Sequence, residues 1–229
     1  MINPKTAVLI FANSSETEGI NKSFSFGSDL FDSLNERTIK MVEKTGLPHF
    51  HFSEKEQIGN CFGDRFTNAI QRIMDMGFEN VITVGNDTPS LSKKHILEAA
   101  ASLAKSRMVF GPSRDGGFYL MGLNRSQFNS EIFKTFPWQT SRLIHVLEKH
   151  FLNKEQVEIR KLEMLFDIDS LSDLKSIHEK INQFSARLKT AILKLLFSTV
   201  HNFSLYNFHF LQVERIFIFN KGSPSISSH

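Results

Sequence analysis

Three aspartates follow segments that have the composition of buried strands, and their carboxylates could serve one site. They are Asp87 after residues 81–84, Asp115 after residues 108–110 and Asp169 after residues 157–162. Ligands of an open parallel sheet bind outside the carboxyl ends of its strands, so we expect the three side chains to converge. Carboxylates at that edge can hold a hard divalent cation that also binds phosphate oxygens, or one of them can act as a general base.

Each aspartate taken alone also fits a purely structural role. Asp87 lies two residues before Pro89, where its side chain could cap a turn or a helix. Asp115 stands beside two glycines and could be a turn residue, and Asp169 could cap a helix that contains Leu174. Because the three occur at successive strand ends, together they favour a site more than any one of them does singly.

Glycines accompany two of these aspartates. Gly85 directly follows residues 81–84, and Gly116 and Gly117 directly follow Asp115. A residue without a Cβ atom lets the backbone pass close to a ligand or form a tight hairpin. These glycines are therefore candidate cofactor-binding positions, although an Asp-Gly-Gly tripeptide alone is a weak signal.

Motifs of several other enzyme classes are missing from the sequence. The nine histidines show no metal-ligand spacing, and there is no Walker phosphate loop, nucleophile elbow or dinucleotide fingerprint. Kinase, serine hydrolase and NAD-dependent enzyme functions therefore have no motif support.

Apolar segments of strand length alternate with helical periodicity over most of the chain. The predicted strands are residues 7–11, 49–52, 81–84, 108–110, 118–121 and 157–162. The predicted helices begin at Ser28, Asp64, Ser92, Pro137 and Ser172, and the first two end near Gly46 and Gly77. This alternation with short connections predicts an α/β fold of three αβα layers with a mostly parallel sheet.

The composition narrows the function classes. With 41% hydrophobic and 22% charged residues, the 229-residue chain is typical of a soluble globular protein. A net charge of +3 is too small to predict a nucleic-acid partner. The single cysteine, Cys61, excludes an intramolecular disulfide and a cysteine-rich zinc site, and we expect it to be a small packed residue. Without a signal peptide or an apolar run near ~20 residues, we expect a cytoplasmic protein with no transmembrane segment.

A domain boundary is predicted near Gln183, which divides the chain into residues 1–183 and a Phe-rich extension, 184–229. The extension holds seven phenylalanines, and residues 195–213 contain no Asp, Glu, Lys or Arg. Polar residues interrupt this segment too often for a bilayer span. It could be a helix lying against the main domain, a homodimer surface or an amphipathic membrane contact.

Five sequence motifs resemble, in order, those of one transferase family. The matches are 57–66 with Q-x-G-x-x-L-G-E-R-M, 85–91 with G-S-D-x-P-x-L, 111–123 with G-P-x-x-D-G-G-Y-Y-L-x-G-L, 136–140 with I-P-W-S-T, and 167–174 with D-V-D-T-P-E-D-L. The family has the glycosyltransferase-A fold and is called radical-SAM/selenodomain-associated transferase 1. It is related to phospholactate guanylyltransferase and to molybdenum-cofactor nucleotidyltransferases. The resemblance covers residues 5 to 180.

The resemblance implies a nucleotide-diphospho-sugar transferase fold and glycosyl or nucleotidyl transfer from a nucleotide or nucleotide sugar to a small acceptor. It implies that Mg²⁺ or Mn²⁺ bridges the nucleotide phosphates and is held by Asp87 and Asp169. It also places Asp115, Gly116 and Gly117 at the acceptor or sugar side of the cleft. Asp87 and Asp115 are the implied catalytic residues.

The chain departs from the family pattern after the first strand. The family has F-A-K-x-P-x-P-G-x-V-K-T-R-L, a loop that holds phosphates. Here Asn13 replaces the first lysine and Phe24 the arginine, and Glu16 and Glu18 are added. Gly19 and Lys22 keep the G-x-x-K spacing. Since carboxylates repel phosphates, either Lys22 and the metal suffice, the donor differs, or the chain is a non-catalytic binding or regulatory relative.

Overall fold

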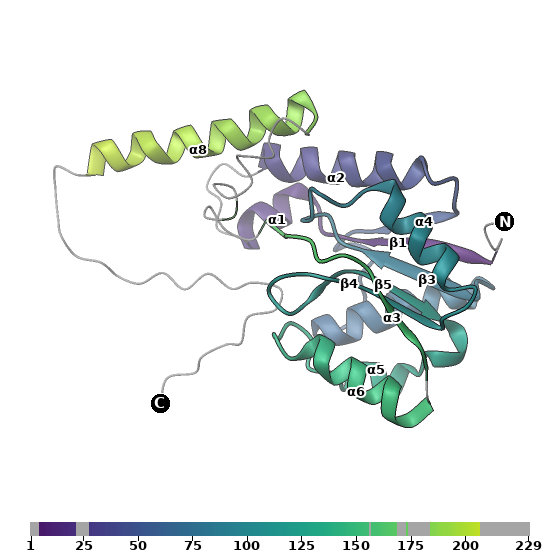
Figure 1. Ribbon diagram of the computed structural model, residues 1–229. Coiled ribbons are helices and arrows are strands. Elements are labelled where there is room, and N and C mark those ends of the chain that lie inside the picture. Colours follow the sequence, from purple (N-terminus) through teal and green to yellow (C-terminus); the bar gives the residue numbers. More distant parts are fainter. Residues whose placement is uncertain (1–4, 22–27, 156, 169–172, 174–183, 207–229) are drawn as a thin grey trace, which may run out of the picture.

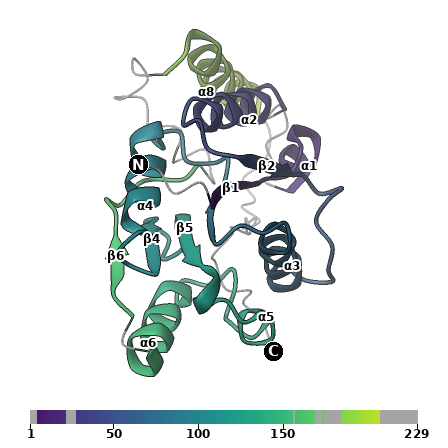
Figure 2. The same cartoon turned by 90° about the vertical axis from the view of Figure 1, so that its right-hand side faces the viewer.

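A computed structural model describes residues 5–21, 28–155, 157–168, 173 and 184–206, and it shows three layers (Figure 1). A central sheet has α2 (Ser28–Glu43) and α4 (Lys93–Ser102) on one face. The other face is covered by α3 (Phe62–Asp75), α5 (Ser130–Lys134) and α6 (Leu143–Glu155), as Figure 2 also shows. The predicted αβα arrangement is confirmed.

The sheet has six strands in the order β2-β1-β3-β5-β4-β6. The strands are β1 (Thr6–Phe11), β2 (His49–Phe52), β3 (Asn80–Val84), β4 (Met108–Pro112), β5 (Phe118–Asn124) and β6 (Ile159–Lys161). Only β5 runs antiparallel to its neighbours, β3 and β4, and the other pairings are parallel. The mostly parallel sheet is therefore confirmed, with β3 in its interior and β6 at one edge.

Both faces of the sheet are buried, which explains the continuous apolar strands of the sequence. Every residue of β1 is buried. Leu9 packs into the cluster that includes residues of α3 and α6, whereas Val8 packs with residues of α2 and α4. Because successive side chains of a strand point to opposite faces, one apolar run supplies both cores.

Two predicted features of the helical layers differ in the structure. The helix predicted to begin at Pro137 begins only at Leu143. Gln139 has a φ of 59°, a left-handed conformation that no α-helix includes, so the segment before Leu143 is a turn. Cys61 is exposed rather than packed, because it is the N-cap of α3 and its sulfur accepts the amide N–H of Asp64 at 3.4 Å.

The helix α8 (Ala186–Tyr206) lies along α2 at the outside of the molecule (Figure 1). Leu188, Ile192 and Leu195 of α8 form a buried cluster with residues of α2 and with Ile168. The first part of α8 therefore packs on α2. No helix in the described ranges has the length and apolar character to cross a membrane.

Two further short helices complete the described part of the chain. The helix α1 (Ser15–Asn21) follows β1, and the 3₁₀ turn η1 (Arg125–Gln127) follows β5. The predicted helix beginning at Ser172 lies outside the described residues.

Candidate functional site

Three aspartates line one cleft at the end of the sheet where β1, β3 and β4 terminate. They are Asp87, Asp115 and Asp167, and among the described residues no lysine or arginine lines the same cleft. Its inner volume of about 70 Å³ has room for an ion and a few water molecules but not for a whole nucleotide. The base of the cleft is therefore acidic, and most of a ligand as large as a nucleotide would lie outside it, nearer the surface.

Asp87 lies directly after β3 and is only 6% exposed. A Cβ atom on Gly85 would lie 2.9 Å from Asp87 Oδ1, so the glycine leaves room for this carboxylate. The hydroxyl of Thr88 donates a hydrogen bond to Asp167 Oδ1. Gly85 also lines the cleft, so the turn after β3 forms part of the cleft wall. Through Thr88 the same turn also binds the segment that carries Asp167.

The carboxylate of Asp115 is held by its own turn. Its Oδ1 accepts hydrogen bonds from the Ser113 hydroxyl at 2.5 Å and from the Gly117 amide at 2.9 Å. Gly116 has a φ of 89°, and a Cβ atom there would lie 2.5 Å from the carbonyl oxygen of Ser141. Gly116 is thus required by the turn, whereas Gly117 also lines the cleft.

The structure brings together some of the predicted site residues and leaves others undescribed. Asp87, Asp115, Gly85 and Gly117 lie around the cleft. Gly19 is part of α1. Two further predicted residues, Lys22 and Asp169, lie outside the described residues. Their roles, like those of the residues in the cleft, stay predictions.

Asp167 is a cleft residue that the sequence analysis did not assign to the site. The signal for it was the Asp-x-Asp spacing, because residues two apart in an extended segment lie on the same side of the chain. The intervening Ile168 is fully buried in the cluster formed by α2 and α8. This burial fixes the segment, so that Asp167 lines the cleft.

Aromatic side chains form the opposite wall of the cleft. Phe62 and Phe66 stack with ring centroids 5.5 Å apart, and Trp138 packs edge-on against Phe66 at 5.0 Å. The Trp138 indole N–H donates to the carbonyl of Phe133 at 2.6 Å. A Cβ atom on Gly63 would lie 2.5 Å from the Trp138 ring, so α3 and the tryptophan approach closely. The ligand would meet an acidic wall and an apolar one.

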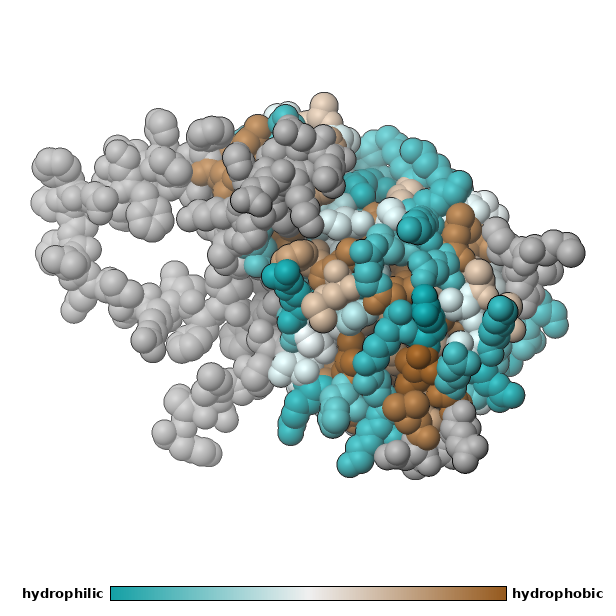
Figure 3. Space-filling view, viewed as in Figure 1, coloured by the Kyte–Doolittle hydropathy of each residue, from teal (hydrophilic) through white to brown (hydrophobic). Residues whose placement is uncertain are grey.

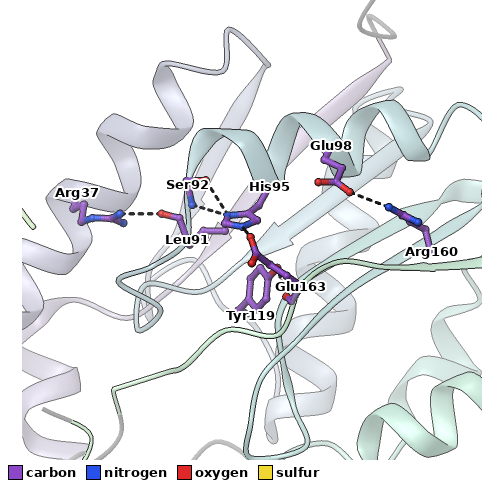
Figure 4. A network of polar contacts seen from close by, with 8 residues as sticks. All are labelled: Arg37, Leu91, Ser92, His95, Glu98, Tyr119, Arg160 and Glu163. Carbon is purple, nitrogen blue, oxygen red and sulfur yellow. Dashed lines mark hydrogen bonds and ion pairs between the residues drawn. The ribbon is translucent and has the colours of Figure 1, made fainter. Parts of the chain in front are cut away.

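A polar network joins Tyr119, which lines the cleft, to Glu163 and to His95 of α4 (Figure 4). The hydroxyl of Tyr119 donates to the carbonyl of Glu163 at 2.9 Å, and the Glu163 carboxylate lies 2.7 Å from His95 Nε2. The amide of Ser92 donates to His95 Nδ1 at 3.0 Å, which leaves Nε2 as the protonated nitrogen facing Glu163. Burial, followed by the nearby carboxylates, raises the pKa of Tyr119. Tyr119 is therefore a neutral hydrogen-bond donor at the cleft.

The loop after β1 is stabilised by carboxylates of the chain itself. Glu54 accepts the amide of Ser14 at 2.7 Å and its hydroxyl at 2.8 Å. Asn13, at the position of the family's first lysine, donates to Glu18 at 3.0 Å. Glu18 is only 2% exposed, whereas Glu16 faces solvent. Of the two added carboxylates, Glu18 is therefore held inside the loop by a hydrogen bond, whereas Glu16 stays at the surface.

Asparagine side chains connect this loop to the turn after β3. Asn86 donates to Asn35 Oδ1 at 2.8 Å, and Asn35 donates to the carbonyl of Asn13 at 3.2 Å. Asn86 Oδ1 is buried and accepts no hydrogen bond from the described residues. Local sequence patterns do not indicate these contacts, because the three asparagines come from separate segments.

The donor atoms of the cleft suit a hard cation. Carboxylate and hydroxyl oxygens are the donors that Mg²⁺ and Mn²⁺ prefer, and Mg²⁺ is often held by one or two carboxylates together with substrate phosphates. Within the described part of the chain, no three His, Cys, Asp or Glu side chains form a group that could hold a metal alone. Asp87 and Asp167 offer carboxylate oxygens to such a cation, and its other ligands would come from a bound phosphate or from water.

Comparisons with known proteins agree with this fold. The family described as "Uncharacterized protein conserved in bacteria (DUF2064)" matches residues 38–140. A "putative nucleotide-diphospho-sugar transferase" from Desulfovibrio desulfuricans G20 superposes with a TM-score of 0.70 at 16% identity, covering 87% of this chain and 98% of that chain. This similarity shows the nucleotide-diphospho-sugar transferase fold that the sequence predicts.

Two more distant solved structures also match. The 4-diphosphocytidyl-2C-methyl-D-erythritol synthase of Anaerococcus prevotii DSM 20548 gives a TM-score of 0.49 at 13% identity, over 79% of this chain and 98% of that chain. A cytidylyltransferase from Leptospira borgpetersenii serovar Hardjo-bovis gives 0.44 at 13% identity, over 91% and 99%. A comparison with curated proteins finds no match.

Proposed function

We propose that the protein is a metal-dependent transferase that acts on a nucleotide-activated substrate, by glycosyl or nucleotidyl transfer. One observation carries this proposal: three aspartates line a cleft at the carboxyl ends of parallel strands, with no lysine or arginine among its described lining residues. Such a cleft repels a diphosphate unless a cation accompanies it. The divalent cation is therefore required for the nucleotide to bind.

Asp87 and Asp167 are the described residues that would hold Mg²⁺ or Mn²⁺, and Asp169 is the further ligand that the family resemblance implies. When bound, the cation neutralises charge on the diphosphate leaving group. The buried position of Asp87 keeps bulk water from one side of the carboxylate. Its turn therefore provides a fixed anionic site.

Asp115 has a different role in this proposal. Two hydrogen bonds to Oδ1 fix its orientation, and Oδ2 forms none with the described residues. That oxygen can accept the proton of an acceptor hydroxyl as the acceptor attacks. The wall formed by Phe62, Phe66 and Trp138 shields the reacting atoms from water.

A second candidate is a binding or regulatory protein that keeps the fold without turnover. The observation that favours it lies in the loop after β1, where the amide and the hydroxyl of Ser14 both donate hydrogen bonds to Glu54. These two donors are therefore already used and cannot bind the phosphates of a nucleotide at the same time. The two candidates differ in turnover but share the metal-dependent cleft.

Product analysis separates the two candidates. Nucleoside triphosphates and nucleotide sugars are incubated with the full chain in Mn²⁺ or EDTA, together with a mixture of sugar, alcohol and phosphorylated acceptors. Release of pyrophosphate indicates nucleotidyl transfer, and release of nucleoside diphosphate indicates glycosyl transfer. Turnover in Mn²⁺ that Asp115→Asn abolishes supports the transferase. Mn²⁺-dependent binding without turnover supports the non-catalytic protein.

The remaining assignments are also proposals. The ligand is a nucleotide or nucleotide sugar, the acceptor is a small molecule, and residues 1–183 form the transferase domain with 184–229 as an extension. Packing of α8 on α2 uses Leu188 and Ile192, so a homodimer would use other parts of the extension. Analytical ultracentrifugation of the full chain tests the dimer.

A further inference from the structure

We propose that a second groove, separate from the cleft, binds a soluble oligophosphate or a small molecule that carries one. This basic groove lies between α2, the first turn of α4 and the start of α8, and has a volume of about 420 Å³. That volume is within the range of small-molecule sites, roughly 300–1,000 Å³. It shares no lining residue with the cleft. Its charged residues are Glu36, Arg37, Lys40, Lys44, Lys93 and Arg187.

The charges of the basic groove are unbalanced. Glu36, the one acid among the described residues that line it, pairs with both Lys40 and Arg187. Arg37, Lys44 and Lys93 pair with no carboxylate of the described residues. Like charges gathered in one groove repel, and a bound anion relieves that repulsion. The imbalance therefore points to an anionic ligand.

Arg37 is positioned before any ligand arrives. Its guanidinium donates to the carbonyl of Leu91 at 2.9 Å, which ties α2 to the segment before α4 (Figure 4). Burial lowers the pKa of Arg37, and a bound anion would favour its charged form. Because one end of the guanidinium is already held, little side-chain entropy is lost when the remaining N–H groups bind phosphate oxygens.

The spacing of the cations favours several phosphates over one. Arg37 and Lys40 lie on α2, and Lys44 directly follows its last residue, with its amide still bonded to the Lys40 carbonyl. The three cations are three and then four residues apart, so they follow one face. Seven residues of helix span about 10 Å, which exceeds the size of a single phosphate. Lys93 faces the same groove from α4. Hydrophilic residues predominate over α4 and the adjoining part of α2 in Figure 3, as expected for a site of charged ligands.

Inorganic tripolyphosphate is the probe, titrated into the full chain by calorimetry in EDTA. Without metal, the cleft is expected to bind no phosphate, so the heat reports the basic groove. The double variant Lys44→Ala/Lys93→Ala should bind about tenfold more weakly or worse, because two charge-assisted contacts are lost. The matched control, Lys94→Ala/Lys105→Ala, removes the same net charge from exposed lysines outside the groove and should keep its affinity within about twofold of native.

Three results would overturn the proposal: no tripolyphosphate binding by the native chain, equal weakening in both double variants, or retention on anionic phosphatidylglycerol vesicles that tripolyphosphate does not compete away. Unchanged melting temperatures would show that the variants fold. Asp87→Asn should bind tripolyphosphate in EDTA as the native chain does. A changed affinity in that variant, above all tighter binding once the repelling carboxylate is neutral, would assign the anion to the cleft. Failure of the transferase proposal would leave the tripolyphosphate result unchanged.

Discussion

The backbone amide of Ile168 donates to the carbonyl of Asp87 at 2.8 Å. Beside it, Thr88 binds Asp167, two residues that are 79 positions apart in the sequence. These two contacts attach the segment after β6 to the end of β3. An acidic segment from the edge of the sheet thereby reaches the cleft at its centre.

We expect Thr88→Val to weaken Mn²⁺ binding. The substitution removes the hydroxyl that holds Asp167 but keeps a similar side-chain volume. A hydrogen bond to a charged group contributes about 1.5–3 kcal/mol, so Mn²⁺ affinity should fall by roughly tenfold to a hundredfold. Calorimetric Mn²⁺ titration in the presence of a nucleotide measures the change. Thr135→Val removes a hydroxyl that binds the Ile132 carbonyl instead and is the control; an equal loss there would contradict the assignment.

Gly111→Ala should destabilise the fold through Tyr119. A Cβ atom at position 111 would lie 2.3 Å from Tyr119 Cζ, and Tyr119 is 2% exposed. Overpacking of this kind costs about 1–3 kcal/mol of unfolding free energy, measured by urea denaturation. In a Tyr119→Leu background the cost of Gly111→Ala should shrink, because the clash is removed. Equal costs in both backgrounds would show that Tyr119 is not the cause.

The contact between Glu54 and Ser14 should make stability depend on pH. Burial raises the pKa of Glu54, but the hydrogen bonds from Ser14 outweigh it and leave the pKa below its ordinary value of 4.5. A carboxyl group whose pKa is lower in the folded state than in the unfolded state stabilises the fold at pH values above the unfolded-state pKa. This stabilisation is lost as the pH falls through the folded-state pKa. Glu54→Gln should therefore differ most from native near neutrality and converge with it in acid.

Chemical denaturation at several pH values measures this difference. Glu131→Gln is the matched control, because Glu131 is exposed on α5 and its contact with Lys134 is at the surface. The difference between native and Glu131→Gln should vary little with pH. A difference between native and Glu54→Gln that grows in acid would contradict the prediction.

Much of the fold could be predicted because its strands are buried on both faces. Runs such as residues 7–11 are continuously apolar, whereas the alternating residues 157–162 contain β6, one of the two edge strands of the sheet. The start of α6 could not be predicted, since proline suits a turn as well as a helix start. There, burial of the Trp138 ring and its bond to Phe133 favour the turn.

Less of the site could be predicted, because its contacts join distant segments. Asp87 and Asp115 were identifiable from their places after strands. Asp167 and the hydrogen bond between Asn86 and Asn35 depend on side chains meeting across the fold, which local patterns do not encode. The role of Cys61 as a helix cap was missed, since sulfur is an uncommon capping acceptor.

The most direct test of the central claim is calorimetric binding of nucleoside triphosphates and nucleotide sugars to native, Asp87→Asn and Asp32→Asn proteins, with Mn²⁺ and with EDTA. Asp32 is exposed on α2 and lines neither the cleft nor the basic groove, so its variant controls for the lost charge. We predict that Mn²⁺ enables nucleotide binding by native and Asp32→Asn proteins, and that Asp87→Asn abolishes this metal-dependent part. Binding in Mn²⁺ that Asp87→Asn leaves intact would contradict the claim that the cleft holds a metal-bound nucleotide.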